Sequence, residues 1–193
     1  GITDQIAPQT FAGLEVLRYV TELTAKYNTE IIVTIRQPTV FPLAQEIVRQ
    51  GYITAGRPDM FQEDTVQFLS SEQFAYAAGV LGIFNRRKVA ANIMMGAFWA
   101  ESLLFAEGGA QVGAIQVAGT ASMAQLPFFV AACDYCLLGE ELYAAGAYLS
   151  QDKVKLGSIG AQDIAKAITM VILLVGSLLA TAEIDGLANL LKK

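Results

Sequence analysis

The sequence predicts an α/β fold with three layers, in which a Rossmann-like, mostly parallel sheet of about five strands is followed by a C-terminal hydrophobic helix. Two observations support this prediction: short apolar runs alternate with helical patterns along residues 10–150, and turn residues separate them. Such alternation is typical of a parallel sheet that helices cover on both faces. A chain of 193 residues is long enough for one such domain and an appendage.

Helices and strands alternate through the first half of the chain. Leu14 and Leu17 belong to a series of apolar residues at three-residue spacing, which predicts an amphipathic helix ending at Asn28. Ser70, with a glutamine three residues later, matches a capping box at the start of another helix. The expected elements are, in order, a helix over 10–27, a strand over 30–35, a helix over 39–56, a strand over 65–69 and a helix over 71–84.

The second half repeats the alternation. The runs VAANIMM and PFFVAAC have the length and apolar character of buried strands. Gly108 and Gly109 are expected to end a short helix, because glycine is common just beyond a helix. The expected elements are, in order, a strand over 89–95, a helix over 100–107, strands over 113–119 and 127–133, and a helix over 139–150.

The last part of the chain has a different character. Residues 151–163 are polar and contain two glycines, which indicates a linker between a domain at 1–150 and a segment at 164–193. In that segment the uncharged run from Ala167 to Ala182 covers about 24 Å as a helix, somewhat less than a hydrocarbon core of about 30 Å. The length of this helix fits either a core helix in a larger helical layer or a membrane span. Because the α/β domain is complete without this helix, we expect a membrane span.

Composition excludes several function classes. The net charge of −5 argues against sequence-independent nucleic-acid binding, which needs a basic surface. The chain has no histidine, so Ser-His-Asp and Cys-His catalysis and His-ligated metal sites are excluded. No spacing of residues resembles a metal site, no nucleotide-binding glycine motif is present, and no cofactor is expected. The first ten residues do not have the pattern of a signal peptide.

Several strings of the sequence resemble an uncharacterised family of bacterial and archaeal integral membrane proteins. The strings are IIVTIRQPTVFPLAQEIVRQGY, QFAYAAGVLGI, GAIQVAGTASMAQLPFFVAACDYC and GEELYAAGAYLS, and the resemblance covers roughly residues 7–181. It implies an α/β portion followed by a hydrophobic helix, with further segments upstream. It implies no activity and no catalytic residues.

Polar residues that follow the expected strands form the candidate site, because ligands bind beyond the carboxyl ends of strands in a parallel sheet. Arg36, directly after the first strand, offers a planar guanidinium for a carboxylate or phosphate. A structural role is the alternative, in which Arg36 pairs with Asp134 or Glu101 and holds strand ends together. The candidate residues for a small anionic ligand are Arg36, Gln37, Gly119, Thr120, Ser122 and Asp134.

Cys133 and Cys136 have the spacing of a redox pair. However, Cys133 is expected to close an apolar strand, whereas a thioredoxin-like cysteine begins a helix. If both lie in one strand, their Cα atoms are separated by about 10 Å, too far for a disulfide; a turn at Asp134 is the alternative that would bring them closer. We therefore interpret both as reduced structural cysteines.

Two functions remain from the sequence. One is a membrane-anchored α/β module with a structural or assembly role in a homo-oligomer, in the cell membrane, with its α/β domain on the cytoplasmic side. Lys153, Lys155 and Lys166 precede the apolar run and favour that orientation, whereas Lys192 and Lys193 beyond the run weaken the charge difference. The other is a binding protein or enzyme for a small anionic ligand at the carboxyl ends of the strands. The absence of a catalytic motif favours a non-enzymatic role.

Overall fold

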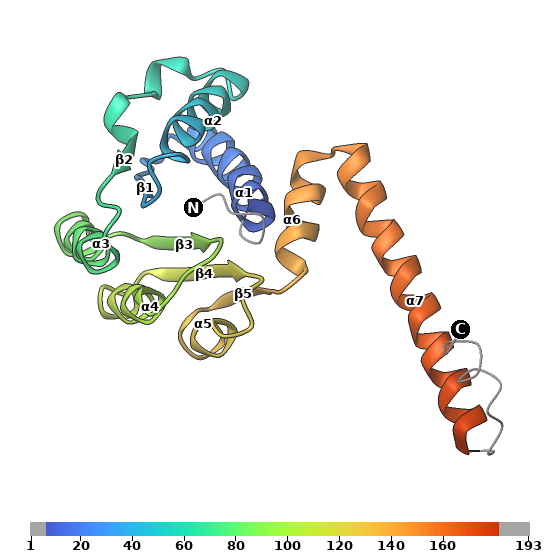
Figure 1. Ribbon diagram of the computed structural model, residues 1–193. Coiled ribbons are helices and arrows are strands. Elements are labelled where there is room, and N and C mark those ends of the chain that lie inside the picture. Colours follow the sequence, from blue (N-terminus) through green and yellow to red (C-terminus); the bar gives the residue numbers. More distant parts are fainter. Residues whose placement is uncertain (1–6, 182–193) are drawn as a thin grey trace. The chain divides into compact units, whose positions relative to one another are not determined.

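The computed structural model describes residues 7–181 and separates the chain into two compact units, Gly1–Ser150 and Gln151–Lys193 (Figure 1). The helices of the first unit are α1 (Ala7–Lys26), α2 (Phe41–Thr54), α3 (Gln73–Arg87), α4 (Glu101–Gln111), α5 (Leu126–Ala132) and α6 (Glu141–Ser150), with short 3₁₀ turns at Pro58–Met60 and Glu63–Thr65. Its strands are β1 (Val33–Ile35), β2 (Val66–Phe68), β3 (Ala91–Met95), β4 (Ile115–Thr120) and β5 (Tyr135–Leu138).

All strand pairs of the described chain are parallel, but they form two sheets. β1 pairs with β2, so that Val33 lies opposite Val66. β3, β4 and β5 form the second sheet in that order, with Met95 opposite Gly119. The α/β class is confirmed, whereas the expected continuous sheet of about five strands is wrong. In the described residues β1 and β3 are not paired: a cavity lined by residues of both strands lies between them, and Tyr76 of α3 bonds to the backbone of β1.

Helices cover both faces of the three-stranded sheet (Figure 1). α1 and α6 pack on one face: a side chain at Gly13 would meet Met95, and one at Gly119 would meet Leu142. α3, α4 and α5 enclose a core on the other face, which includes Phe105 and Phe129. A second core lies between α1, α2 and the sheet of β1 and β2. The two cores correspond to the two sheets.

The segment 127–133 is a helix and not the strand that the sequence predicts. Pro127 occupies the first turn of α5, where proline needs no hydrogen-bond donor. Phe129 is 1% exposed, whereas Phe128 and Val130 on either side are 44% and 57% exposed. A short apolar run fits a strand or a helix equally well, and here only one side of it is buried. The fifth strand, β5, lies directly after this helix.

Two expected helix boundaries are also wrong. α4 continues through Gly108 and Gly109 because these glycines pack closely: a β-carbon at Gly109 would lie 2.1 Å from Oε1 of Gln116. The chain turns instead at Gly113, whose φ is +74°. Ser70 and Gln73 do not form a capping box, since the residue before α3 is Glu72 and Gln73 bonds elsewhere. Asn28 does adopt the left-handed conformation expected at the end of α1, with φ of 52°.

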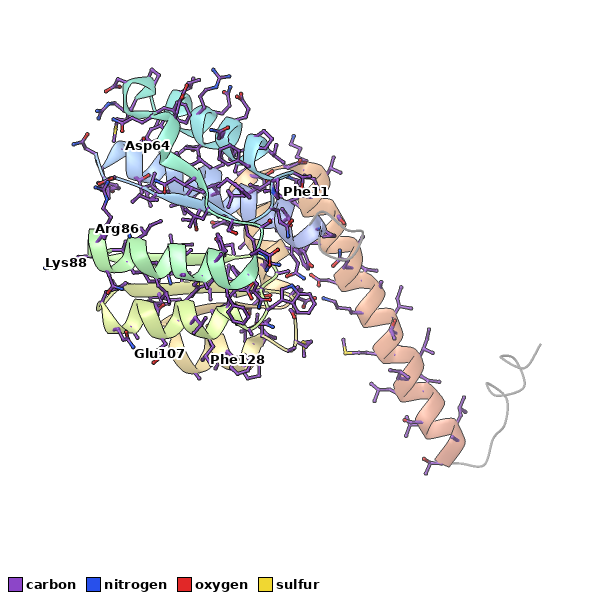
Figure 2. The ribbon with its side chains drawn as sticks, turned by 60° about the vertical axis from the view of Figure 1, so that its left-hand side comes forward. Phe11, Asp64, Arg86, Lys88, Glu107 and Phe128 are labelled. Carbon is purple, nitrogen blue, oxygen red and sulfur yellow. The ribbon has the colours of Figure 1, made fainter. Side chains whose placement is uncertain are left out.

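The second unit contains helix α7, Lys153–Thr181, which has 29 residues. Residues 153–163, interpreted from composition as a linker, belong to this helix. None of its side chains is buried, and they extend from every side of the helix (Figure 2). With a mean hydropathy of 2.1 over eighteen residues, α7 is long and apolar enough to cross a membrane. The expected C-terminal hydrophobic helix is confirmed as an element; residues 182–193 lie outside the described part.

Candidate functional site

Arg36 forms an ion pair at the carboxyl end of β1. Its Nη1 donates to Oε1 of Glu101 over 2.8 Å. Glu101 is the first residue of α4 and is 1% exposed, while the Arg36 side chain is 24% exposed. The pair therefore links β1, from one sheet, with the helix that follows β3 in the other sheet. Of the two carboxylates considered for Arg36, the structure brings Glu101 to it and not Asp134.

The other carboxylate oxygen of Glu101 also has a partner. Nε2 of Gln73, at the start of α3, donates to Oε2 over 2.5 Å. A buried carboxylate is tolerated only when it is paired and hydrogen-bonded, and Glu101 meets both conditions. Nε of Arg36 donates to the carbonyl oxygen of Ser71 at 3.4 Å. The arrangement is a charge-balanced group and not an uncompensated cationic site.

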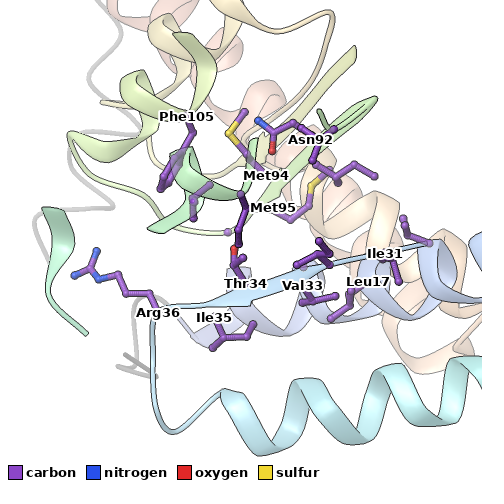
Figure 3. A pocket seen from close by; sticks show the side chains of 18 of the residues that line it. Leu17, Ile31, Val33, Thr34, Ile35, Arg36, Asn92, Met94, Met95 and Phe105 are labelled. Carbon is purple, nitrogen blue, oxygen red and sulfur yellow. The ribbon is translucent and has the colours of Figure 1, made fainter. Parts of the chain in front are cut away.

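A cavity of about 570 Å³ extends from this ion pair between the two sheets. Its size is within the range of ligand pockets. Leu17 and Val33 lie on one side of it and Met94 and Phe105 on the other, with Arg36 at one end (Figure 3). Gln37 also borders it. Most of its lining is apolar, and its polar lining side chains include Arg36, Thr34, Tyr76 and Asn92.

A second ion pair lies at the opposite end of the cavity. Arg87, the last residue of α3, pairs with Glu30, which precedes β1. Both side chains border the cavity, and both are more than half exposed. An exposed pair of this kind contributes little to stability. Together the two pairs connect the β1 half of the domain with the α3–α4 half at either end of the cavity.

Tyr76 of α3 connects the two halves between these pairs. Its hydroxyl donates to the carbonyl oxygen of Thr34 at 3.2 Å and lies 2.9 Å from Oγ1 of Thr34. Because the first bond uses the tyrosine proton, Oγ1 of Thr34 donates in the second. Burial is the main cause that raises the pKa of Tyr76, and the nearby Glu101 raises it further. Tyr76 is therefore a neutral hydrogen-bonding group at physiological pH.

Three of the predicted site residues belong to a separate network at the end of β4. Thr120 is fully buried, and its Oγ1 accepts a hydrogen bond from the backbone of Ser122 at 3.1 Å. Oε1 of Gln9 in α1 lies 3.3 Å from that hydroxyl and accepts from the Ala121 backbone at 3.0 Å. Gly119, Thr120 and Ser122 are not among the described residues that line the cavity. This turn is held by α1 and does not join Arg36.

Asp134 lies at the amino end of β5, so its expected place at the carboxyl end of a fifth strand is wrong. The error follows from the helical segment before it: β5 begins after Asp134 and not before it. Oδ2 of Asp134 accepts from the backbone N–H of Gln116 at 2.7 Å. This carboxylate fixes the β4–β5 register at the sheet edge opposite to Arg36.

Cys133 and Cys136 are both free thiols and half-buried. Cys133 follows α5 and Cys136 lies within β5. Burial, with smaller contributions from Cys136 and Asp134, raises the pKa of Cys133 to about 11. Burial also raises the pKa of Cys136. Reactive cysteines have a lowered pKa, so these two thiols lack the electrostatic environment of a redox pair.

The residues that sequence reasoning missed are the partners on α3. Gln73 and Tyr76 are three positions apart and share one helix face, and both point toward the β1 end of the domain. The three-residue spacing places both polar side chains on one helix face, which the sequence shows. That this face lies beside β1 could be known only from the packing of α3. In the described residues 7–181, no group of three or more cysteine, aspartate or glutamate side chains could hold a metal ion.

Comparison with known families gives one match, which covers almost the whole chain. The match extends over residues 1–191 and is to a domain of unknown function, DUF6754. Searches among curated proteins and among solved structures find no match. The expectation of an uncharacterised family is thereby confirmed: the chain belongs to the DUF6754 family of unknown function.

Proposed function

We propose that this chain is a membrane-anchored α/β module with a structural or assembly role in a homo-oligomer. The supporting observation is α7, whose apolar side chains are exposed around the whole circumference. A helix that is apolar on every side requires either a core or lipid around it. Among the described residues of its unit, 151–181, no side chain of α7 is buried, so lipid is the solvent that fits this helix. The resemblance to bacterial and archaeal integral membrane proteins supports the same proposal.

The length of the helix is compatible with a span. Residues 164–181 form its apolar part and cover about 27 Å at 1.5 Å per residue, close to the hydrocarbon thickness of about 30 Å. Lys166 is the charged residue within this part and pairs with Asp163 at 3.5 Å. A lysine near the end of a span extends its side chain toward the interface. Lys153, Lys155 and Lys166 at the amino end favour a cytoplasmic α/β domain.

Membrane extraction tests the anchor. The full chain is expected in the membrane pellet after an alkaline carbonate wash and in solution only with detergent. Replacing Leu173 and Leu174 together by arginine should release it, because each charge at the centre of a span costs about 3 kcal/mol. Arginines at Ser158 and Gln162, in the polar half of α7, are the matched control and should leave the pellet unchanged. A wild-type chain that is monodisperse without detergent contradicts the proposal.

Two further measurements address orientation and assembly. Protease added to sealed inverted vesicles should digest the α/β domain, whereas right-side-out vesicles should protect it. Light scattering in detergent should give a mass of at least two chains. A monomer over a hundredfold concentration range would remove the homo-oligomer from the proposal, and digestion in right-side-out vesicles would reverse the orientation.

A second candidate is the binding of a small anionic ligand at the carboxyl end of β1. The cavity bordered by Arg36 and Gln37 favours it, because the Arg36 guanidinium has more N–H groups than Glu101 and Ser71 use. Mass spectrometry of small molecules released from the purified full chain tests it. A molecule present in the wild type and in Arg49→Ala, but lost in Arg36→Ala and Gln37→Ala while the circular dichroism spectra of all four proteins agree, supports this function. Identical contents in all four proteins contradict it.

A further inference from the structure

The hydrogen bonds of β3 define which of its backbone groups point away from β4. Ala90 accepts from the N–H of Ile115, and Gly96 donates to the carbonyl oxygen of Gly119, both at 2.9 Å. In a parallel ladder, alternate residues bond to the same neighbour. The even-numbered residues from Ala90 to Gly96 therefore bond to β4. The N–H and C=O groups of Ala91, Ile93 and Met95 point to the other edge, toward β1.

The same reasoning applies to β1. Ile35 accepts from the N–H of Leu69 at 3.4 Å, so Val33 and Ile35 face β2. The backbone groups of Thr34 point to the opposite edge, where Tyr76 bonds to its carbonyl oxygen. Two parallel strand edges thus face each other across the cavity, and residues of both edges line it. Unpaired strand edges are templates for another strand.

We propose that this gap binds an extended peptide segment of a partner protein, which is inserted as a strand between β1 and β3. This inference is independent of the membrane anchor. The guest backbone pairs with Thr34 on one side and with Ala91, Ile93 and Met95 on the other. The sheet order becomes β2, β1, guest, β3, β4 and β5, a single continuous sheet. Main-chain pairing of this kind is an established mode of peptide recognition.

The two walls of the cavity define the side chains of the guest. Leu17 and Val20 of α1 line one wall, and Val80 and Ile83 of α3 line the other. Successive side chains of a strand point to opposite faces, so both sets of guest side chains meet apolar walls. The segment is therefore apolar at consecutive positions, like a buried parallel strand. β3 has five residues, and a guest of similar length covers about 17 Å.

A small apolar molecule fits this gap less well than a peptide. It covers the walls but offers no hydrogen bonds to the backbone groups of Ala91, Ile93 and Met95 or to the N–H of Thr34, and each buried group left unpaired is unfavourable. A peptide supplies donors and acceptors to both edges. It must also replace the Tyr76 hydroxyl at the Thr34 carbonyl, so this tyrosine caps the edge of β1 in the free protein.

Hydrogen exchange of the full chain, measured residue by residue, gives the first test. Without peptide, the amides of Thr34, Ile93 and Met95 should exchange at least about tenfold faster than those of Asn92 and Met94, which bond to β4. If Thr34, Ile93 and Met95 are as protected as Asn92 and Met94, the two sheets are joined in solution and the proposal is overturned.

Peptide selection gives the second test. The probe is a displayed library of random seven-residue peptides, selected on the full chain. Selected peptides should be rich in apolar residues and should protect the Ile93 amide at least about tenfold. They should bind at least ten times more weakly to Ile93→Pro. This substitution removes the backbone N–H of Ile93, which points into the gap, and leaves the hydrogen bonds between β3 and β4 in place.

A matched proline on the outer edge of the same sheet is the control. The backbone N–H of Asp134 donates to the carbonyl oxygen of Gln116 in β4. The N–H of the next residue, Tyr135, therefore points away from β4, and Tyr135→Pro should bind the peptides like the wild type. Selected peptides that bind Ile93→Pro and wild type equally, or a library that yields none, overturn the proposal. If Ile93→Pro does not fold, the selected peptides are N-methylated at alternate backbone positions and tested on the wild-type chain, because N-methylation removes backbone donors from the peptide. Unchanged binding of the methylated peptides overturns the proposal.

Discussion

Tyr76 and Thr34 are joined by two hydrogen bonds, one to the Thr34 carbonyl oxygen at 3.2 Å and one involving Oγ1 at 2.9 Å. The residues are 42 positions apart in the chain. Through them α3 holds the edge of β1 that faces β3. A side-chain hydroxyl thus takes the place of a strand at the edge where a continuous sheet would place β3.

Replacing Tyr76 by phenylalanine should lower the free energy of unfolding by about 1–3 kcal/mol, because it removes two hydrogen bonds that usually contribute about 0.5–1.5 kcal/mol each. Urea unfolding measures this change. Tyr27→Phe is the control, because Tyr27 is 76% exposed and should change stability by less than about 0.5 kcal/mol. Equal effects of the two variants would show that the Tyr76 hydroxyl does not stabilise the domain.

Arg36→Ala should destabilise the domain by about 3–5 kcal/mol, because it leaves the Glu101 carboxylate buried without its cation. Chemical unfolding of the full chain checks the value. Arg49→Ala is the matched control, since Arg49 and Glu46 are about half exposed and such pairs contribute about 1 kcal/mol or less. Adding Glu101→Gln to Arg36→Ala should restore part of the stability, and a further loss would contradict the assignment.

Gly109→Ala should cost about 1–3 kcal/mol as an overpacking substitution. The new β-carbon would contact Oε1 of Gln116, which accepts from Asn92 at 3.0 Å. Gln116 is 1% exposed and also donates to two backbone carbonyls, so it cannot move freely. Thermal unfolding should show the loss, whereas Ala110→Ser on the exposed side of α4 should change the melting temperature little.

Raising the pH from 9 to 11 should destabilise the domain through Cys133. The pKa of this thiol is raised from about 9 to about 11, so the folded state retains a proton that the unfolded chain loses. The stabilisation is fully present below pH 9 and is lost as the pH rises through 11. Unfolding of wild type and Cys133→Ala across this range measures the difference. Parallel curves for the two proteins would contradict the raised pKa.

The sequence predicted many elements because their signals are local. The apolar spacing of α1, the left-handed Asn28 and the β-branched run before Arg36 each depend on residues close in the chain. PFFVAAC failed because an apolar run of seven residues fits a strand and a helix equally. Its actual state depends on burial, since Phe129 enters a core and Phe128 does not. That error displaced Asp134 to the wrong end of a strand.

The candidate site was predicted in part for the same reason. Arg36 was found because a polar residue directly after a strand lies at a defined sheet edge. Its pairing with Glu101 was one of two alternatives, and residues 65 positions apart are brought together only by packing. Gly108 and Gly109 show the opposite case: alone they indicate a helix end, but Leu81 and Gln116 pack where their side chains would be.

The sequence by itself determined the α/β class, the parallel direction of the strands and the apolar helix at the end, because composition and periodicity encode them directly. Tertiary structure alone decided that the strands form two sheets. The strand pairing of the described residues shows that division, since β1 pairs only with β2 and the Thr34 carbonyl on its other edge accepts from Tyr76. Such contacts join distant residues with no common local pattern, so their outcome follows from packing and hydrogen bonding in three dimensions.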